Sequence, residues 1–100
     1  MNPRVFLVDD HDVVRRGLAA LIDAEDDLEV VGTAGSASET PGVVATCRPD
    51  VAILDIRLGD GNGVEVCRDI RSAHPEIACL ILTSFEDDQA LVGASLAGAA

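Results

Sequence analysis

Residues 51–54 constrain the fold more strongly than any other part of this sequence. The segment Val-Ala-Ile-Leu is apolar at every position and ends abruptly at Asp55, before a loop that contains three glycines. A short run that is apolar on both faces is typical of a strand buried in a parallel sheet. Because sites in open α/β sheets lie beyond the carboxyl ends of the strands, Asp55 is predicted to lie at a functional site.

The rest of the chain alternates between strand-like and helical patterns. Strands are predicted over residues 4–8, 28–34, 51–54 and 79–83, and helices over about 12–24, 37–47, 63–73 and from 86 to the end. The second helix is the least regular, because Pro41 is tolerated only in a first turn and allows a start as late as Thr40. Alternating strands and helices with short connections predict an α/β domain with one parallel sheet and right-handed crossovers.

Two of the predicted helices carry an apolar stripe at helical spacing, which we expect to face the sheet. The stripes consist of Val14, Leu18, Leu21 and Ile22 in the first helix and Val66, Cys67, Ile70 and Ala73 in the third.

The composition narrows the possible functions. The 100 residues have a formal net charge of −11, and all seven basic residues are arginines. Nucleic-acid binding by this segment is disfavoured because phosphate contacts need clustered Arg and Lys, whereas a cation or a basic partner suits the charge. Three separated cysteines without a CxxC motif indicate neither a zinc site nor a disulfide framework. The apolar runs are too short to span a bilayer and the start is not a signal peptide, so a cytoplasmic location is expected.

Three carboxylates are predicted to meet at one edge of the sheet. Asp9 and Asp10 follow the first strand directly, as Asp55 follows the third. They would repel one another without a cation, and hard oxygen ligands of this kind suit Mg²⁺. With the cation present, a carboxylate can act as nucleophile toward a phosphoryl group. Thr83, at the end of the fourth strand, would then hydrogen-bond to a phosphoryl oxygen on Asp55.

These residues also have ordinary structural interpretations. The acids could cap a helix or form turns, but their joint occurrence on two strands favours a site. His11 has no second histidine at ligand spacing and is interpreted as a loop residue. Gly59, Gly61 and Gly63 match neither the dinucleotide fingerprint nor the P-loop, and are interpreted as turn residues beside the site.

Three stretches of the sequence resemble the receiver domain of bacterial two-component response regulators. They are VFLVDDHDVVRRGL, DVAILDIRLGDGNGVEVCRDI and CLILTS, and the first is similar to the NarL/FixJ subfamily. The resemblance covers the whole chain and implies a flavodoxin-like (CheY-like) doubly wound sheet with strand order 2-1-3-4. It also implies a sensor histidine kinase as partner. In this subfamily a LuxR-type helix-turn-helix output domain usually follows and carries the DNA binding.

The resemblance assigns a role to each residue that matches the family pattern. Asp55 would accept the phosphoryl group from the kinase. Asp10 and Asp55 would bind Mg²⁺ through their side chains, Arg57 through its main-chain carbonyl, and Asp9 largely through water. Thr83 would be the switch hydroxyl. The tuning positions, which affect the phosphoryl lifetime, would be occupied by Arg57 and Phe85.

The sequence departs from the family pattern at two points. Gly59 stands where the family usually has proline, which predicts a looser loop. The family's fifth strand carries a lysine that pairs with the phosphoryl oxygens, but this sequence ends at Ala100 and has no lysine. Residues 1–100 are therefore interpreted as a truncated receiver domain that lacks strand 5, helix 5 and the output domain.

Such a truncation predicts self-association, for example as a homodimer. The strand at 79–82 would form an apolar edge with open hydrogen-bonding groups. Loss of the fifth helix would uncover Val14 and Leu18. The helix from residue 86 carries Leu91, Val92 and Leu96 on more than one face, and such a helix usually has a partner.

Three hypotheses for the function follow. The first is a phosphorylatable switch, which is a regulatory domain and not a metabolic enzyme. The second is a haloacid-dehalogenase-like phosphatase with Asp55 as nucleophile; it is disfavoured because such enzymes place a second aspartate where Arg57 stands. The third is a dimerisation module that works without phosphorylation, which the missing lysine favours and the acidic pocket disfavours.

Overall fold

The computed structural model describes residues 2–82, and residues 1 and 83–100 are not described. The predicted helix from residue 86, and the predicted site residues Thr83 and Phe85, therefore lie outside the described part. The elements are β1 (Arg4–Val8), α1 (Asp12–Asp23), β2 (Glu29–Ala34), α2 (Thr40–Cys47), β3 (Val51–Asp55), β4 (Arg57–Leu58), β5 (Gly61–Asn62), α3 (Gly63–Ala73) and β6 (Ala78–Leu82). Between residues 2 and 82, no helix has the length and apolar character needed to cross a membrane.

The main sheet has four parallel strands in the order β2-β1-β3-β6. Since β6 is the predicted fourth strand, the expected order 2-1-3-4 is confirmed. The small antiparallel pair β4–β5 was not predicted from the sequence, because each strand has only two residues and the glycines there indicate a turn.

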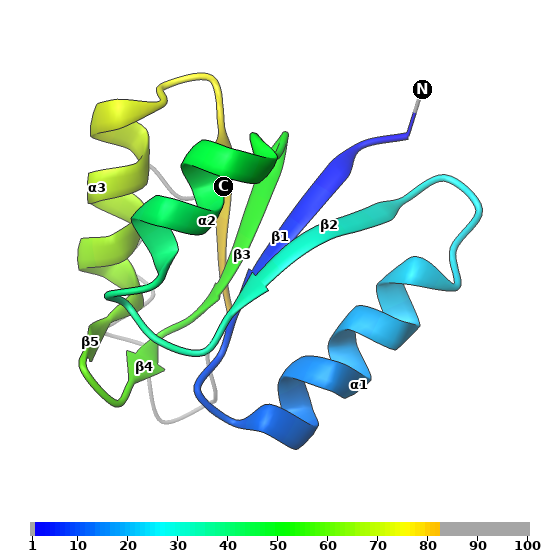
Figure 1. Ribbon diagram of the computed structural model, residues 1–100, viewed down its shortest axis with the longest axis horizontal. Coiled ribbons are helices and arrows are strands. Elements are labelled where there is room, and N and C mark those ends of the chain that lie inside the picture. The colour runs from blue at the N-terminus through cyan, green and yellow to red at the C-terminus, as the bar shows by residue number, and fades with distance from the viewer. Residues whose placement is uncertain (1, 83–100) are drawn as a thin grey trace.

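The sheet is covered on both faces, as a doubly wound fold requires (Figure 1). In Figure 1, α1 lies on one side of the sheet, and α2 and α3 lie on the other. The core is aliphatic apart from Phe6, which is fully buried. Cys67 of α3 and Cys79 of β6 are also fully buried in it. Burial and the neighbouring Cys67 raise the pKa of the Cys79 thiol to about 12, so this thiol stays protonated and inert at neutral pH.

The predicted apolar stripe of α1 is only partly buried. Leu18 and Ile22 are half-buried against the sheet, but Val14 is 49% and Leu21 69% exposed. The predicted burial was wrong for these two residues, because the contacts of α1 with β1 and β2 leave this part of its stripe uncovered. For Val14, however, exposure is also what a domain without a fifth helix was expected to show. Ala73 of α3 is exposed as well, since it lies in the last turn and faces the groove toward α2.

The helix α2 begins late, as Pro41 allows. Thr40 is its first residue, Pro41 lies in its first turn, and Glu39 holds the N-cap position. The Thr40 hydroxyl donates a hydrogen bond to the carbonyl of Ser36, at 2.9 Å. The helix ends at Arg48, whose φ of 46° lies in the left-handed region that favours glycine.

Candidate functional site

Four ionisable side chains gather at the carboxyl edge of the sheet. Asp9, Asp10 and His11 follow β1, and Asp55 is the last residue of β3; one potential ligand atom from each lies within 4.8 Å of the others. The two strands are parallel neighbours paired up to the end of β1, so the residues that follow them emerge side by side. The structure therefore brings together the three carboxylates that the sequence predicts to meet.

His11 lies across these carboxylates, although the sequence alone favours a plain loop residue. Its Nδ1 atom is 3.2 Å from Asp9 Oδ1, 3.0 Å from Asp10 Oδ1 and 4.0 Å from Asp55 Oδ2. Its main-chain N–H also donates to Asp9 Oδ1, at 2.8 Å. The sequence signal for this placement is the position of His11 between a pair of acids and the first turn of α1, where it is the N-cap residue.

The electrostatics of the cluster favour a bound cation. The pKa of Asp55 is raised, first by burial of its carboxyl group and then by the negative charge of Asp9 and, to a smaller extent, of Asp10. Hydrogen bonds from the main-chain N–H groups of Arg57 and Ile56 oppose the shift. Asp9 itself is only 5% exposed. Carboxylates this close to one another repel, and a positive charge among them relieves the repulsion.

Arg15 of α1 supports the loop that carries Asp9. Its Nη1 donates to the main-chain carbonyl of Asp9 and its Nη2 to Asp12 Oδ1, both at 2.7 Å. Gly35 leaves room for this guanidinium, because a Cβ there would lie 2.9 Å from Arg15 Nη1. The helical pattern gives no sign of this role, since it shows only that Arg15 lies off the apolar stripe.

Gly63, interpreted from the sequence as a turn residue, is required by close packing behind Asp55. A Cβ on Gly63 would lie 3.1 Å from the carbonyl carbon of Asp55 and closer still to its oxygen. The N–H of Gly63 donates to the carbonyl of Ile56 at 2.9 Å, and Asn62 caps α3 by accepting from the N–H of Val64 at 2.7 Å. The start of α3 is thus packed directly onto the end of β3.

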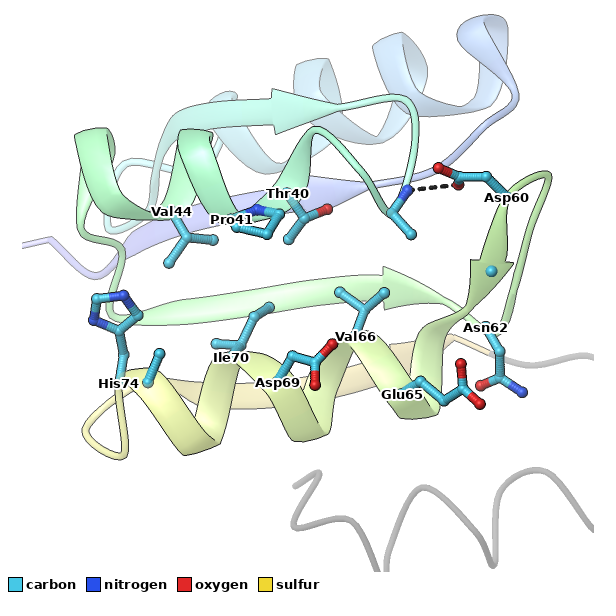
Figure 2. A pocket seen from close by; sticks show the side chains of 13 residues that line it. Thr40, Pro41, Val44, Asp60, Asn62, Glu65, Val66, Asp69, Ile70 and His74 are labelled. Atoms are coloured by element: carbon cyan, nitrogen blue, oxygen red, sulfur yellow. Dashed lines mark hydrogen bonds between the residues drawn. The ribbon is translucent and has the colours of Figure 1, made fainter.

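The loop after Asp55 is held by the β4–β5 pair and by Asp60. The two oxygens of Asp60 accept hydrogen bonds from the main-chain N–H groups of Ala37 and Ser38, at 2.7 and 3.0 Å; Figure 2 draws the bond to Ala37. The bond from Ala37, and to a smaller extent the bond from Ser38, lower the pKa of Asp60. They limit the freedom that Gly59 is expected to give the loop. Arg57, the other predicted site residue here, lies in β4 and is exposed.

Comparisons with known proteins agree with this architecture. Residues 5–100 match the family described as the response regulator receiver domain. The chain belongs to this family. The transcriptional activator DevR/DosR of Mycobacterium tuberculosis is 58% identical over 96 residues, which are 96% of this chain and 44% of the relative. LiaR of Bacillus subtilis is 38% identical over 96% of this chain and 46% of the relative.

Solved structures of response regulators have the same fold as this chain. A LuxR-family response regulator from Aurantimonas superimposes with a TM-score of 0.91 at 32% identity, over 99% of this chain and 71% of that one. The receiver domain of NarL from M. tuberculosis superimposes with a TM-score of 0.89 at 26% identity, over 98% and 79%. The flavodoxin-like fold and the resemblance to response regulator receiver domains, both predicted from the sequence, are confirmed. The chain spans less than half the length of these curated relatives.

Proposed function

We propose that this receiver domain is a phosphorylatable switch in which Asp55 accepts a phosphoryl group from a sensor histidine kinase. The observation that supports this role is the placement of Asp55 at the end of β3, beside Asp9 and Asp10 and open enough for a donor to approach. In this proposal Asp10 and Asp55 would hold Mg²⁺ through their side chains, Arg57 through its main-chain carbonyl, and Asp9 largely through water.

The residues of the cluster fit Mg²⁺ chemically. They offer hard carboxylate oxygens close together, and this is the ligand type that Mg²⁺ prefers. When bound, the cation neutralises charge on the carboxylates and on the incoming phosphoryl group. Asp55 attacks in its ionised form: a carboxylate oxygen bonds to phosphorus while the bond from phosphorus to the ring nitrogen of the kinase histidine breaks. That nitrogen leaves with the bonding electron pair.

The proposed response to phosphorylation involves residues outside the described part of the chain. Thr83 is proposed as the switch hydroxyl that responds to the phosphoryl group, and Phe85 as a tuning residue together with Arg57. DNA binding, which the name of the relative DevR/DosR states for that protein, is proposed only for an output domain that follows residues 1–100 in the whole protein. The charge of −11 supports this separation. A cytoplasmic location, shared with the kinase domain that donates the phosphoryl group, is part of the same proposal.

The two alternatives remain outcomes of a test. A phosphatase of the haloacid-dehalogenase type needs an acid two residues after its nucleophile, and the residue there is Arg57. A dimerisation module that works without phosphate predicts no adduct on Asp55. We expect the chain to self-associate whichever of these functions it has. The contacts would be made by the β6 edge and by the exposed side of α1, where Val14 and Leu21 lie. Light scattering that gives the mass of one chain at high concentration would contradict the self-association.

The deciding experiment is intact-protein mass spectrometry after incubation with acetyl phosphate, with and without Mg²⁺. We expect a single phosphoryl adduct that requires Mg²⁺ and is absent from Asp55→Asn. A second control, Asp50→Asn, changes an aspartate at the opposite end of β3 that binds the Arg4 main chain, and should keep the adduct. A folded chain that forms no adduct, or one that is modified equally after Asp55→Asn, overturns the proposal.

A further inference from the structure

A groove of about 380 Å³ runs between α2 and α3, away from α1 (Figure 2). Its floor is apolar, with Val44 from α2 and Val66 and Ile70 from α3. The β4–β5 hairpin lies at one end and His74 at the other. Among the described residues, the groove shares no lining residue with the carboxylate cluster. Its size lies in the range of ordinary ligand pockets, which combine apolar walls with a few polar groups.

One side of this groove carries negative charge that the described chain does not neutralise. Glu65 and Asp69 stand one turn apart on α3, both exposed, and Figure 2 shows their side chains beside the floor. Within residues 2–82, neither carboxylate has a hydrogen bond or an ion pair. Asp60 differs, because its two oxygens accept from Ala37 and Ser38. An apolar floor beside two unpaired carboxylates is complementary to a ligand that is both apolar and cationic.

We propose that this groove binds a short basic peptide segment of a partner protein. Its apolar side chains would pack on Val44, Val66 and Ile70, and its Arg or Lys side chains would pair with Glu65 and Asp69. The shape favours a peptide over a compact ligand: along α3 the groove follows residues 62–74, which is about 18 Å at the helical rise. An extended segment of five or six residues spans that length. The guanidinium group of arginine suits exposed carboxylates because it can bind both oxygens.

This inference does not depend on phosphorylation, so it can be tested separately from the proposed function. The Asp55→Asn variant should bind the peptide as the parent chain does. The probes are the capped tetrapeptide Arg-Leu-Leu-Arg and its charge-reversed partner Glu-Leu-Leu-Glu. Methyl NMR spectra of the 100-residue chain, recorded during titration, report both the affinity and the place of binding.

We expect the basic peptide to shift the methyl signals of Val44, Val66 and Ile70, and the acidic peptide to leave them unchanged. The double variant Glu65→Gln with Asp69→Asn should weaken binding roughly three- to tenfold, as the loss of two exposed ion pairs implies. Its matched control, Glu25→Gln with Asp27→Asn, changes the same charge in the turn after α1 and should bind normally. Ala73→Arg should abolish binding, because it places both bulk and a cation in the groove.

Three results overturn the proposal. The first is equal binding of the acidic peptide, and the second is binding that the Glu65/Asp69 variant does not weaken although its spectrum shows a folded chain. The third is binding of butylguanidinium alone as tightly as the peptide, which would make the groove a small-molecule site. Added salt provides an independent check, since pairing with exposed carboxylates must weaken as ionic strength rises.

Discussion

Gly63 packs against the main-chain carbonyl of Asp55 so closely that no side chain fits between them. A Cβ at this position would also come within 3.2 Å of Ile56 Cα. The first residue of α3 and the last residue of β3 are thus in direct backbone contact. Since Asp55 stands at the proposed phosphorylation site, this contact links the position of α3 to the position of the acceptor.

The first prediction tests that contact with Gly63→Ala. The added methyl group must push α3 away from β3, and overpacking of this kind costs about 1–3 kcal/mol of unfolding free energy. Phosphorylation by acetyl phosphate should slow as well, because Asp55 would move relative to Asp10. Urea unfolding and the rate of adduct formation measure the two effects.

The matched control for this substitution is Gly42→Ala. Among the described residues nothing lies within 4 Å of a Cβ on Gly42, which is in α2. The change from glycine to alanine in a helix should therefore stabilise the chain by about 0.5–1 kcal/mol. If Gly63→Ala behaves like this control, the close contact with Asp55 has no energetic consequence.

The second prediction concerns the pH dependence at Asp55. Its pKa is raised in the folded chain, so its stabilising contribution is complete below its ordinary pKa of 3.8 and is lost as pH rises through the folded value. At neutral pH and without metal, Asp55→Asn should therefore unfold at a higher urea concentration than the parent. The difference should shrink as pH falls toward 3.8 and below.

Added Mg²⁺ should make the parent chain more resistant to urea than Asp55→Asn. A cation that binds only the folded parent chain at ten times its Kd adds about 1.4 kcal/mol, by mass action. The Asp55→Asn variant should gain less, because one metal ligand has lost its charge. An equal gain in both chains would mean that Mg²⁺ binds elsewhere.

The third prediction concerns Asp60, whose pKa shifts the other way. Because the pKa of Asp60 is lowered in the folded chain, its carboxylate stabilises the fold above pH 3.8. This stabilisation is lost as pH falls through the lower folded pKa. Asp60→Asn should weaken the bonds to Ala37 and Ser38 at neutral pH, and hydrogen exchange at these two amides should become faster. Unchanged exchange would show that the β4–β5 hairpin is not held by this carboxylate.

The fourth prediction concerns Arg48, which has a φ of 46° at the C-cap of α2. A residue with a Cβ is disfavoured there by about 1–2 kcal/mol, and glycine is not. Part of that gain is lost to the greater freedom of glycine in the unfolded chain, so Arg48→Gly should stabilise by about 0.5–1 kcal/mol. Arg68→Gly, in the exposed part of α3, should instead destabilise by about 1 kcal/mol, and urea midpoints distinguish the two.

The sequence by itself determined the strands, the helices and the convergence of the acids. The apolar run before Asp55 and the run before Asp9 each mark a buried strand and its end, because apolar periodicity and strand termination are local properties of the chain. Parallel pairing then places those ends at one edge, so the three carboxylates could be predicted to meet there without coordinates.

Only the tertiary structure decided how segments distant in the sequence touch one another. The support of the Asp9 carbonyl by Arg15, the contact between Gly63 and Asp55, and the groove between α2 and α3 each depend on how closely two elements approach. Exposure of Leu21 was decided in the same way, by how little of α1 the sheet covers. Local patterns record which face of an element is apolar, but they do not record the distance between elements, because packing sets that distance only after the chain has folded.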